Sequence, residues 1–261
     1  MYLSAERLAL ANQTIKETFE QCSIAWQAIP HWDTRDPGQI RVPNDVVDKP
    51  DFLELEAESE KFELTLVQAN APSPDSLLAE VISKTADLAK TVDGIVLKAL
   101  SGKAKTEPLT TPPPPDPLLD ILNTLIKARA DIEDVGYRAP SCLFTNTDGL
   151  IAISPLVSGL PQMGPVLTAA SVNSLHRATT IDPNLAAGKK LFLMLGRRQL
   201  IAHRGAAQAS PGEESVDLAV SVLPSLEVVG EGQNGGIEVS VRIRFVTRIK
   251  DASALVAVVD P

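Results

Sequence analysis

The residues best suited to chemistry in this chain are a run of glycines. Gly230-Glu231-Gly232-Gln233-Asn234-Gly235 fits the G-x-G-x-x-G pattern, which holds a pyrophosphate when a helix begins at its third glycine. Here Gly236 follows, and Ile237–Val241 then alternates as a strand does. We therefore predict that the glycines form a hairpin turn between two strands and not a nucleotide site.

The histidines and cysteines do not group into a metal or catalytic motif. His31, His176 and His203 each stand alone, without a second histidine or a cysteine at ligand spacing. Cys22 and Cys142 lie far apart and are interpreted as reduced thiols. No Gly-x-Ser-x-Gly elbow is present, but a dispersed Ser–His–Asp site stays open because its members need not be adjacent. The sequence thus predicts no metal, no cofactor and no recognisable catalytic centre.

Two small charged groups are interpreted as surface turns. Asp33 and Asp36 flank Arg35, which favours a solvated ion-pair loop over a carboxylate dyad. Arg197-Arg198 follows Gly196 at the end of an apolar run and could hold a phosphate, but a surface turn is favoured. Neither group predicts a function.

The strand expected at 238–249 is the most informative charged element. One face carries Val241, Ile243, Phe245, Thr247 and Ile249, and the other carries Arg242, Arg244 and Arg248, with Val246 among them. An acidic stripe, Glu54, Glu56 and Glu58, lies in an alternating run near the N-terminus. We predict that these stripes pair between subunits; a solvated charged face is the alternative.

Charge along the chain excludes binding of nucleic acid through a basic tail. Residues 1–100 carry 9 basic and 17 acidic side chains, and residues 101–261 carry 15 and 16. Neither part has the excess of lysine and arginine that neutralises phosphates. There is no apolar signal core at the N-terminus and no run of ~18 apolar residues, so we expect a cytoplasmic protein without a membrane span.

The N-terminal third predicts a helix, an extended arm and a strand pair. Ser4 is a helix N-cap, and the apolar spacing continues to Cys22. Residues 26–50 contain several prolines and both tryptophans, Trp26 and Trp32, so we expect an extended arm with a short strand at 39–42. The alternating runs 53–58 and 62–67 predict two strands paired with each other.

Two helices and a set of short strands follow. The stripe of apolar residues over 76–100 predicts a long helix, Pro112–Pro115 a stiff spacer, and Pro117 the start of a helix that ends near Gly136. A further helix is expected over 167–177. The predicted strands cover residues 142–145, 191–195, 200–202, 216–222, 226–229, 237–249 and 254–259.

Three stretches resemble the Hong Kong 97 type of shell subunit, found in tailed-phage major capsid proteins and bacterial encapsulins. The long helix ends in Val92-Asp93-Gly94-Ile95-Val96-Leu97, much as the family's spine helix ends. The run 119–129, followed by Gly136-Tyr137-Arg138-Ala139-Pro140-Ser141 and a strand, looks like the family's axial-domain helix, turn and strand. The segment from Val241 through Lys250 to Val258 looks like its closing strands. The likeness covers most of residues 75–261 in the order of elements.

The resemblance implies an α+β fold with five segments. They are an N-terminal helix and arm (1–37), an extended loop with the strand pair (38–74), a spine helix with proline-rich linker of a peripheral domain (75–116), an axial domain (117–225), and closing strands of the peripheral domain (226–261). In such a shell, the arm with Trp26 and Trp32 is expected to reach across neighbouring subunits.

The resemblance also implies a structural role without catalysis. Copies of the chain are expected to form pentamers and hexamers of a closed icosahedral shell, assembled in a bacterial cytoplasm and present in the virion. Separate scaffolding, portal or decoration proteins are possible partners, and the contents would be dsDNA or protein cargo. Among the functions that the resemblance implies, the capsid of a tailed phage or prophage is the first expectation. An encapsulin shell, in which the helix at 4–22 would help dock cargo, comes second, and a soluble α/β enzyme third. A covalent crosslink through Lys49 or another lysine stays open.

Overall fold

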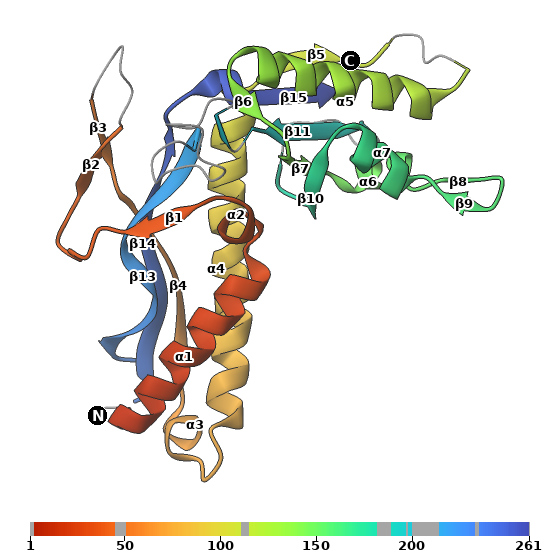
Figure 1. The fold of residues 1–261 in the computed structure, drawn as a ribbon. Helices are drawn as coiled ribbons and strands as arrows, with labels where there is room; N and C mark the ends of the chain where they lie inside the picture. Colours follow the sequence, from red (N-terminus) through yellow and green to blue (C-terminus); the bar gives the residue numbers. More distant parts are fainter. Residues whose placement is uncertain are drawn as a thin grey trace. The chain divides into compact units, whose positions relative to one another are not determined.

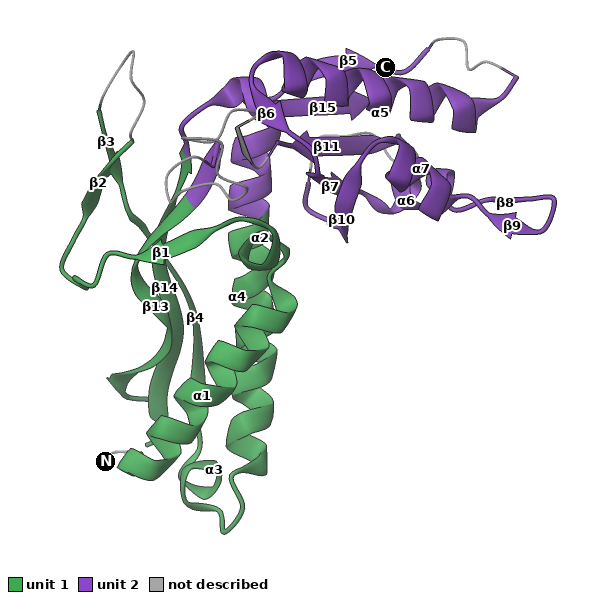
Figure 2. Cartoon of the chain, in the orientation of Figure 1, with its two compact units in different colours: residues 1–93, 218–248 green, residues 94–217, 249–261 purple. Residues whose placement is uncertain are grey.

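The computed structural model describes residues 3–44, 51–110, 115–181, 189–196, 198–199, 214–232 and 235–260. The chain divides into two compact units: residues 1–93 with 218–248, and residues 94–217 with 249–261 (Figure 2). Both units combine helices and sheets, which confirms the predicted α+β class.

The first unit is built on a four-stranded sheet in the order β1-β13-β14-β4. β1 is parallel to β13, β4 is antiparallel to β14, and β2 and β3 form a separate antiparallel pair. The unit contains α1 (Ala5–Cys22), α2 (Ile24–Ala28), β1 (His31–Asp33), β2 (Arg41–Pro43), β3 (Phe52–Glu54), β4 (Glu56–Leu64), α3 (Leu66–Asn70) and most of α4 (Asp75–Ser101), β13 (Val216–Glu231) and β14 (Ile237–Ile249).

The N-terminal helix α1 is the one predicted. The Ser4 side chain accepts a hydrogen bond from the Arg7 backbone N–H, which satisfies one of the free donors at the helix start. Its apolar stripe, Ala11, Ile15 and Phe19, is buried. Asn12 accepts the backbone N–H of Leu226 at 2.8 Å, so α1 is tied to β13 (Figure 1).

The long helix α4 and strand β14 also match their predicted ranges closely. β14 is two-faced, as expected: Val239, Val241, Ile243 and Phe245 are buried, while Arg242 and Arg244 are half-buried on the opposite face. The glycine run joins neighbouring strands β13 and β14, and Gly232 donates to the carbonyl of Gly236 at 2.9 Å. A strand and not a helix follows the glycines, which confirms the hairpin.

The prediction that residues 53–58 and 62–67 form two strands paired with each other is wrong. Half of the two runs, residues 56–58 and 62–64, lies in one strand, β4, which pairs with β14, while β3 pairs with β2. Beyond Leu64 the chain turns into α3, because the Thr65 side chain caps the Gln68 N–H and the Gln68 side chain caps Thr65 in return. A local capping box thus ends the alternation.

The arm and the strand β13 differ from expectation as well. Trp26 lies in the short helix α2, which Ser23 caps. The two strands predicted at 216–222 and 226–229 are the single strand β13 despite Pro224. β1 pairs only with Leu218–Val220, so Pro224 lies beyond that pairing, where a missing N–H is tolerated.

The second unit contains a five-stranded sheet in the order β10-β7-β11-β15-β5. β11 is antiparallel to both of its neighbours, and β10 and β5 are parallel to theirs. The elements are β5 (Lys105–Pro108), α5 (Pro117–Asp134), β6 (Tyr137–Arg138), β7 (Ser141–Thr145), α6 (Thr147–Ile153), β8 (Leu156–Val157), β9 (Leu160–Pro161), α7 (Met163–Ala169), β10 (Val172–Arg177), β11 (Leu191–Leu195), β12 (Arg198–Gln199), a 3₁₀ turn (Ala252–Ala254) and β15 (Leu255–Val259).

The core of this unit lies between α5 and one face of the sheet. α5 begins at Pro117 as predicted, with Asp116 as its N-cap, and buries Ile121, Leu125, Ala128 and Ile132. These side chains pack in one apolar cluster with residues from β7, β11 and β15, including Leu143, Phe192 and Val256.

One expectation for the second unit, a helix, is wrong, and the division into compact units differs from one of the expected segments. The helix expected at 167–177 ends at Ala169, because Ser171 has a positive φ of 50° and Val172–Arg177 then pairs with β7 as a strand. Residues 226–261 were expected in one domain, but β15 belongs to the second unit, where it pairs with β11 and β5. Other expectations, namely the strand 200–202, His203, a crosslink through Lys49 and most of the proline spacer, lie outside the described residues.

Candidate assembly surfaces

The eight residues predicted as subunit contacts all lie in the first unit. The antiparallel register places Arg242 opposite Ser59 and Arg244 opposite Ala57. Glu58 is opposite Ile243 and Glu56 opposite Phe245, on the buried side of β14. Because opposed residues share a face, Glu56 and Glu58 point to one side of the sheet, and Arg242 and Arg244 point to the other. They do not neutralise each other within the chain.

Several of the predicted contacts already have partners in the same subunit. Glu54 forms an exposed ion pair with Arg41 at 2.6 Å. Arg242 pairs with Glu227 at 2.7 Å, and Arg244 donates to the carbonyl of Pro37 at 3.2 Å.

The tryptophans differ sharply in how much of their surface is free. Trp26 is only 8% exposed; it stacks on His31 at 3.8 Å and meets the Phe19 ring edge-on at 5.3 Å. Its burial in its own subunit leaves little surface for a neighbour, and a contact of this residue with another subunit stays a prediction. Trp32 is 36% exposed and lies under the guanidinium of Arg248, 4.8 Å from the ring centroid. Arg248 is 5% exposed and donates to the carbonyl of Pro43, so it too acts mainly within the chain.

A groove along α1 was not foreseen from the sequence. It has a volume of about 570 Å³ and is lined by Phe19 and Trp26 on one side and by Leu223 and Pro224 of β13 on the other, with Lys16 and Glu20 among its polar residues. Burial lowers the pKa of His31, which also lines the groove. The apolar stripe of α1 indicated that the helix packs on something, but no sequence pattern showed that it leaves space on one flank.

Asp93 holds the junction of α1 and α2. Its carboxylate accepts the hydroxyl of Ser23 at 2.7 Å and the backbone N–H groups of Ile24 and Ala25 at 2.9 Å each. Burial raises the pKa of Asp93, and the hydrogen bonds from Ala25, Ile24 and Ser23 oppose part of that increase. The chain therefore breaks at Ser23 in a fixed geometry, which places Trp26 beside the groove.

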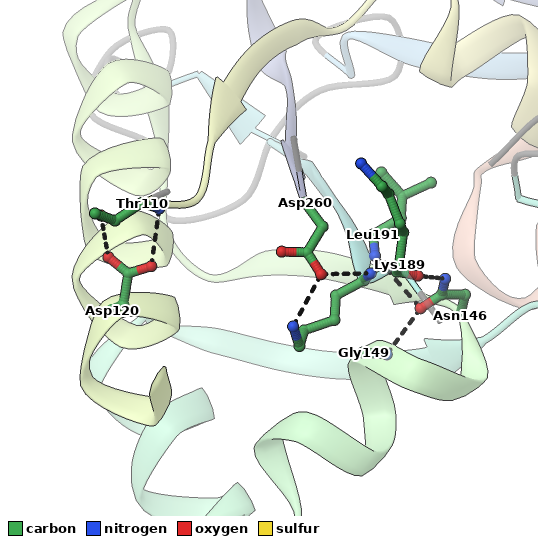
Figure 3. Close-up of polar contacts among 8 residues, drawn as sticks. Thr110, Asp120, Asn146, Gly149, Lys189, Leu191 and Asp260 are labelled. Carbon is green, nitrogen blue, oxygen red and sulfur yellow. Dashed lines mark hydrogen bonds and ion pairs between the residues drawn. The ribbon is translucent and has the colours of Figure 1, made fainter. Parts of the chain in front are cut away.

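Polar contacts in the second unit tie strand ends to helices. Asp120 accepts the backbone N–H and the hydroxyl of Thr110, and the Lys190 ammonium pairs with Asp260 at 2.9 Å (Figure 3). Asn146 caps α6 by accepting the N–H of Gly149 at 2.8 Å, and it donates to the carbonyl of Lys189. These contacts stabilise the unit, and none brings a nucleophile to a base.

The described part of the chain contains no cluster of three or more His, Cys, Asp or Glu side chains able to hold a metal. Cys22 is exposed and Cys142 is buried, and neither forms a disulfide with another described residue. Asp33 and Asp36 accept N–H groups of their own exposed loop, which agrees with a solvated turn. None of the helices described is long and apolar enough to cross a membrane.

Comparison with solved structures identifies the fold. The chain is similar to the virus-like particle from Pyrococcus furiosus, with a TM-score of 0.71 and 16% identity over 97% of this chain and 98% of that one. It is also similar to Mycobacterium phage Bobi (TM-score 0.58, 14% identity, 92% and 90% covered) and to the holo encapsulin complex from Synechococcus elongatus (0.54, 12%, 92% and 88%). No protein-family model matches the sequence, and no curated protein matches it. The chain has the fold of Hong Kong 97-type shell proteins.

Proposed function

We propose that the protein is a structural subunit that assembles with copies of itself into a closed icosahedral shell, and that it is not an enzyme. The fold is the observation that supports this proposal most strongly, because it matches a virus-like particle over nearly the full length of both chains. The leading candidate is the major capsid protein of a tailed dsDNA phage or prophage, located in the virion after assembly in the bacterial cytoplasm. Structures of phage origin among the similar folds support it.

Electron microscopy of the protein purified alone tests the proposal. We expect hollow, closed particles, or pentamers and hexamers if a separate scaffolding protein is required. A monomer of 27.8 kDa or a dimer in every buffer would reject the shell and favour a soluble α/β enzyme.

An encapsulin-type shell enclosing protein cargo is the second candidate. The groove along α1 supports it, because an apolar cleft beside an N-terminal helix is suited to bind a short cargo segment. Particles purified from the native host distinguish the two candidates by their contents. Nuclease-protected dsDNA, with portal or terminase genes nearby, favours the phage capsid; a single enclosed protein favours the encapsulin.

We also propose that the acidic strand of one subunit meets the arginine face of another. Glu56 and Glu58 lie on the face opposite to Arg242 and Arg244, so these side chains have no route to each other within one chain. Arg244 is the best candidate for the contact, since its hydrogen bond in the subunit is exposed and made to a carbonyl, not to a carboxylate. Trp32, exposed beside Arg248, is the tryptophan with surface to contribute.

Charge reversal tests this contact. Arg244→Glu is expected to reduce particle yield at least tenfold, and adding Glu56→Lys is expected to restore part of it. Lys90→Glu is the matched control, because Lys90 is an exposed cation on another element, α4, where it pairs with Asp87 at 3.5 Å. Normal assembly of Arg244→Glu would contradict the contact while leaving the shell itself untouched.

A further inference from the structure

A pocket of about 260 Å³ is formed by residues of β13, β14 and β4, which are neighbours in the sheet of the first unit (Figure 1). The antiparallel register places Ser59 opposite Arg242 and Lys61 opposite Ser240, so these four side chains share one face of the sheet. Arg244 lies two residues further along β14 on the same face and also lines the pocket. Three cationic side chains and two hydroxyls are thus gathered in one place on a chain whose net charge is −9.

Arg242 has an N–H group that its own chain does not use. One of its terminal nitrogens, Nη1, pairs with the carboxylate of Glu227 at 2.7 Å. Its Nε–H is buried, and no described residue accepts a hydrogen bond from it. A guanidinium presents its N–H groups as a rigid fork that matches the oxygens of a carboxylate or a phosphate. Because a buried donor of a charged group is costly to leave without an acceptor, the Nε edge is suited to an acceptor from another molecule.

The other two cations of the pocket are only weakly engaged within the chain. Arg244 donates one N–H group to the carbonyl of Pro37 at 3.2 Å, and this neutral acceptor leaves its charge uncompensated. The Lys61 ammonium lies 3.7 Å from the carboxylate of Glu238, and the Lys61 side chain is 63% exposed. An exposed ion pair at this distance contributes little. Both cations therefore remain able to bind an anion in the pocket.

The donors of the pocket fit an anion with several acceptor oxygens. Two carboxylates, Glu58 and Glu227, line it beside the three cations, which leaves one net positive charge. The donors come from both β4 and β14, and the oxygens of a tetrahedral phosphate point in several directions, whereas those of a carboxylate lie in one plane. Pockets that hold drug-sized ligands have volumes of about 300–1,000 Å³, so this smaller pocket suits a small anion.

We propose that this pocket binds a small oxyanion of the phosphate class, with the Nε edge of Arg242 as its main donor and with Lys61, Ser59 and Ser240 as further donors. The ligand is inorganic phosphate or the phosphate group of a small monoester. The site lies within one subunit, so the proposal goes beyond the shell function and does not depend on it. It is also separate from the contact proposed for Arg244, which is measured by particle yield and not by anion binding.

Titration calorimetry of the purified full-length protein with inorganic phosphate, near neutral pH and at constant ionic strength set by chloride, tests the proposal. We expect saturable binding at one site per chain, and we expect Arg242→Gln to weaken it at least tenfold. Arg41→Gln is the matched control. Arg41 is also a strand arginine of the first unit paired with one glutamate, Glu54 at 2.6 Å, but it does not line the pocket. Its replacement is expected to change the affinity less than twofold.

Arg242→Lys separates recognition by the guanidinium fork from simple attraction of charge. Lysine keeps the positive charge but has no fork, so we expect the affinity to fall nearly as far as in Arg242→Gln. If thermal melting shows that the Arg242 variants do not fold, Ser59→Ala and Lys61→Gln provide the same test, because both residues are exposed on β4. Each of these two variants is expected to weaken phosphate binding at least threefold.

Parallel titrations with glycerol phosphate and with acetate identify the ligand chemistry. Tighter binding of glycerol phosphate than of inorganic phosphate supports a monoester, and equal or weaker binding supports the free anion; both outcomes agree with the proposal. Acetate that binds as tightly as phosphate would overturn the phosphate class. The site itself is rejected by the absence of saturable phosphate binding, or by equal losses of affinity in Arg242→Gln and Arg41→Gln. Failure of the shell function is seen separately, by electron microscopy of the wild type.

Discussion

Asp93 in the first unit and Glu107 in the second are both buried carboxylates, but their partners differ in kind. Asp93 is 4% exposed and accepts three hydrogen bonds from uncharged groups: the Ser23 hydroxyl and two backbone N–H groups of α2. Glu107 is 6% exposed and lies between two ammonium groups, Lys105 at 2.9 Å and Lys127 at 2.5 Å. Lys105 also pairs with Asp131 at 2.9 Å.

This difference in partners shifts the pKa values of the two carboxyl groups in opposite directions. Burial raises the pKa of Asp93, because no described cation offsets the loss of water around its charge. Hydrogen bonds from Lys127 and Lys105 lower the pKa of Glu107. The junction of α1 and α2 thus depends on one side chain with fixed geometry, whereas the β5–α5 contact depends on charges whose lysine ends remain in water.

The largest expected effect comes from removing the carboxylate of Asp93. Asp93→Ala leaves the Ser23 hydroxyl and the N–H groups of Ile24 and Ala25 without their acceptor in a buried place. Each unsatisfied buried donor costs about 1 kcal/mol or more, so we expect a loss of about 3 kcal/mol in the free energy of unfolding, measured by urea denaturation.

Asp120→Ala is the matched control for that loss. Asp120 likewise accepts one backbone N–H and one hydroxyl, both from Thr110, but these bonds are exposed (Figure 3). Water replaces the lost acceptor there, so the expected loss is below about 1 kcal/mol. Equal losses for the two variants would show that burial does not distinguish these carboxylates.

A smaller effect is expected at Glu107. Glu107→Gln removes the charge but keeps the shape, and the released ammonium groups of Lys105 and Lys127 are 55% and 63% exposed, so water can hydrate them. We expect a loss of about 1 kcal/mol, as for partly exposed ion pairs. Glu133→Gln, which breaks the pair with Arg129 within α5, is the control, with an expected loss of about 0.4 kcal/mol. A loss as large as that of Asp93→Ala would remove the contrast between the two units.

The elements that the sequence predicted correctly are those whose signals are local. Ser4 and Pro117 mark helix starts by their own chemistry, and the alternation of 237–249 shows both faces of β14 without any neighbour. The glycine run was recognised as a hairpin because the residues after it alternate. Each of these signals is contained within a few residues of the element it defines.

The wrong predictions concern which strand or side chain each element packs against, and local sequence patterns do not encode this. The acidic run of β4 alternates equally well whether it pairs with residues 62–67 or with β14, and only the fold selects β14. Val172–Arg177 has helical spacing, but β7 provides a strand neighbour. Trp26 was expected in an extended arm, yet it lies in α2, after the break at Ser23 that Asp93 of α4 holds, and it packs on Phe19. The hairpin of β8 and β9 did have a signal, the uncharged run 149–176, which contains its turn Ser158-Gly159.

The smallest expected effect, and the most specific, is how the contributions of Asp93 and Glu107 to stability depend on pH. For Asp93 the folded-state pKa is raised, so its contribution to stability is present below the unfolded value of 3.8 and is lost as pH rises through the folded value. For Glu107 the folded-state pKa is lowered, so its contribution is present above the unfolded value of 4.5 and is lost as pH falls through the folded value. The two groups therefore respond to acid with opposite signs.

Chemical denaturation of wild type, Asp93→Asn and Glu107→Gln between pH 7 and pH 3 measures this contrast. On acidification the stability gap between wild type and Asp93→Asn is expected to widen, because only the wild type gains from protonating Asp93. The gap between wild type and Glu107→Gln is expected to narrow, because the wild type loses its paired carboxylate. If both differences in the free energy of unfolding change in the same direction with pH, the pKa values of the two carboxyl groups are shifted in the same direction. The contrast between Asp93 and Glu107 is then wrong.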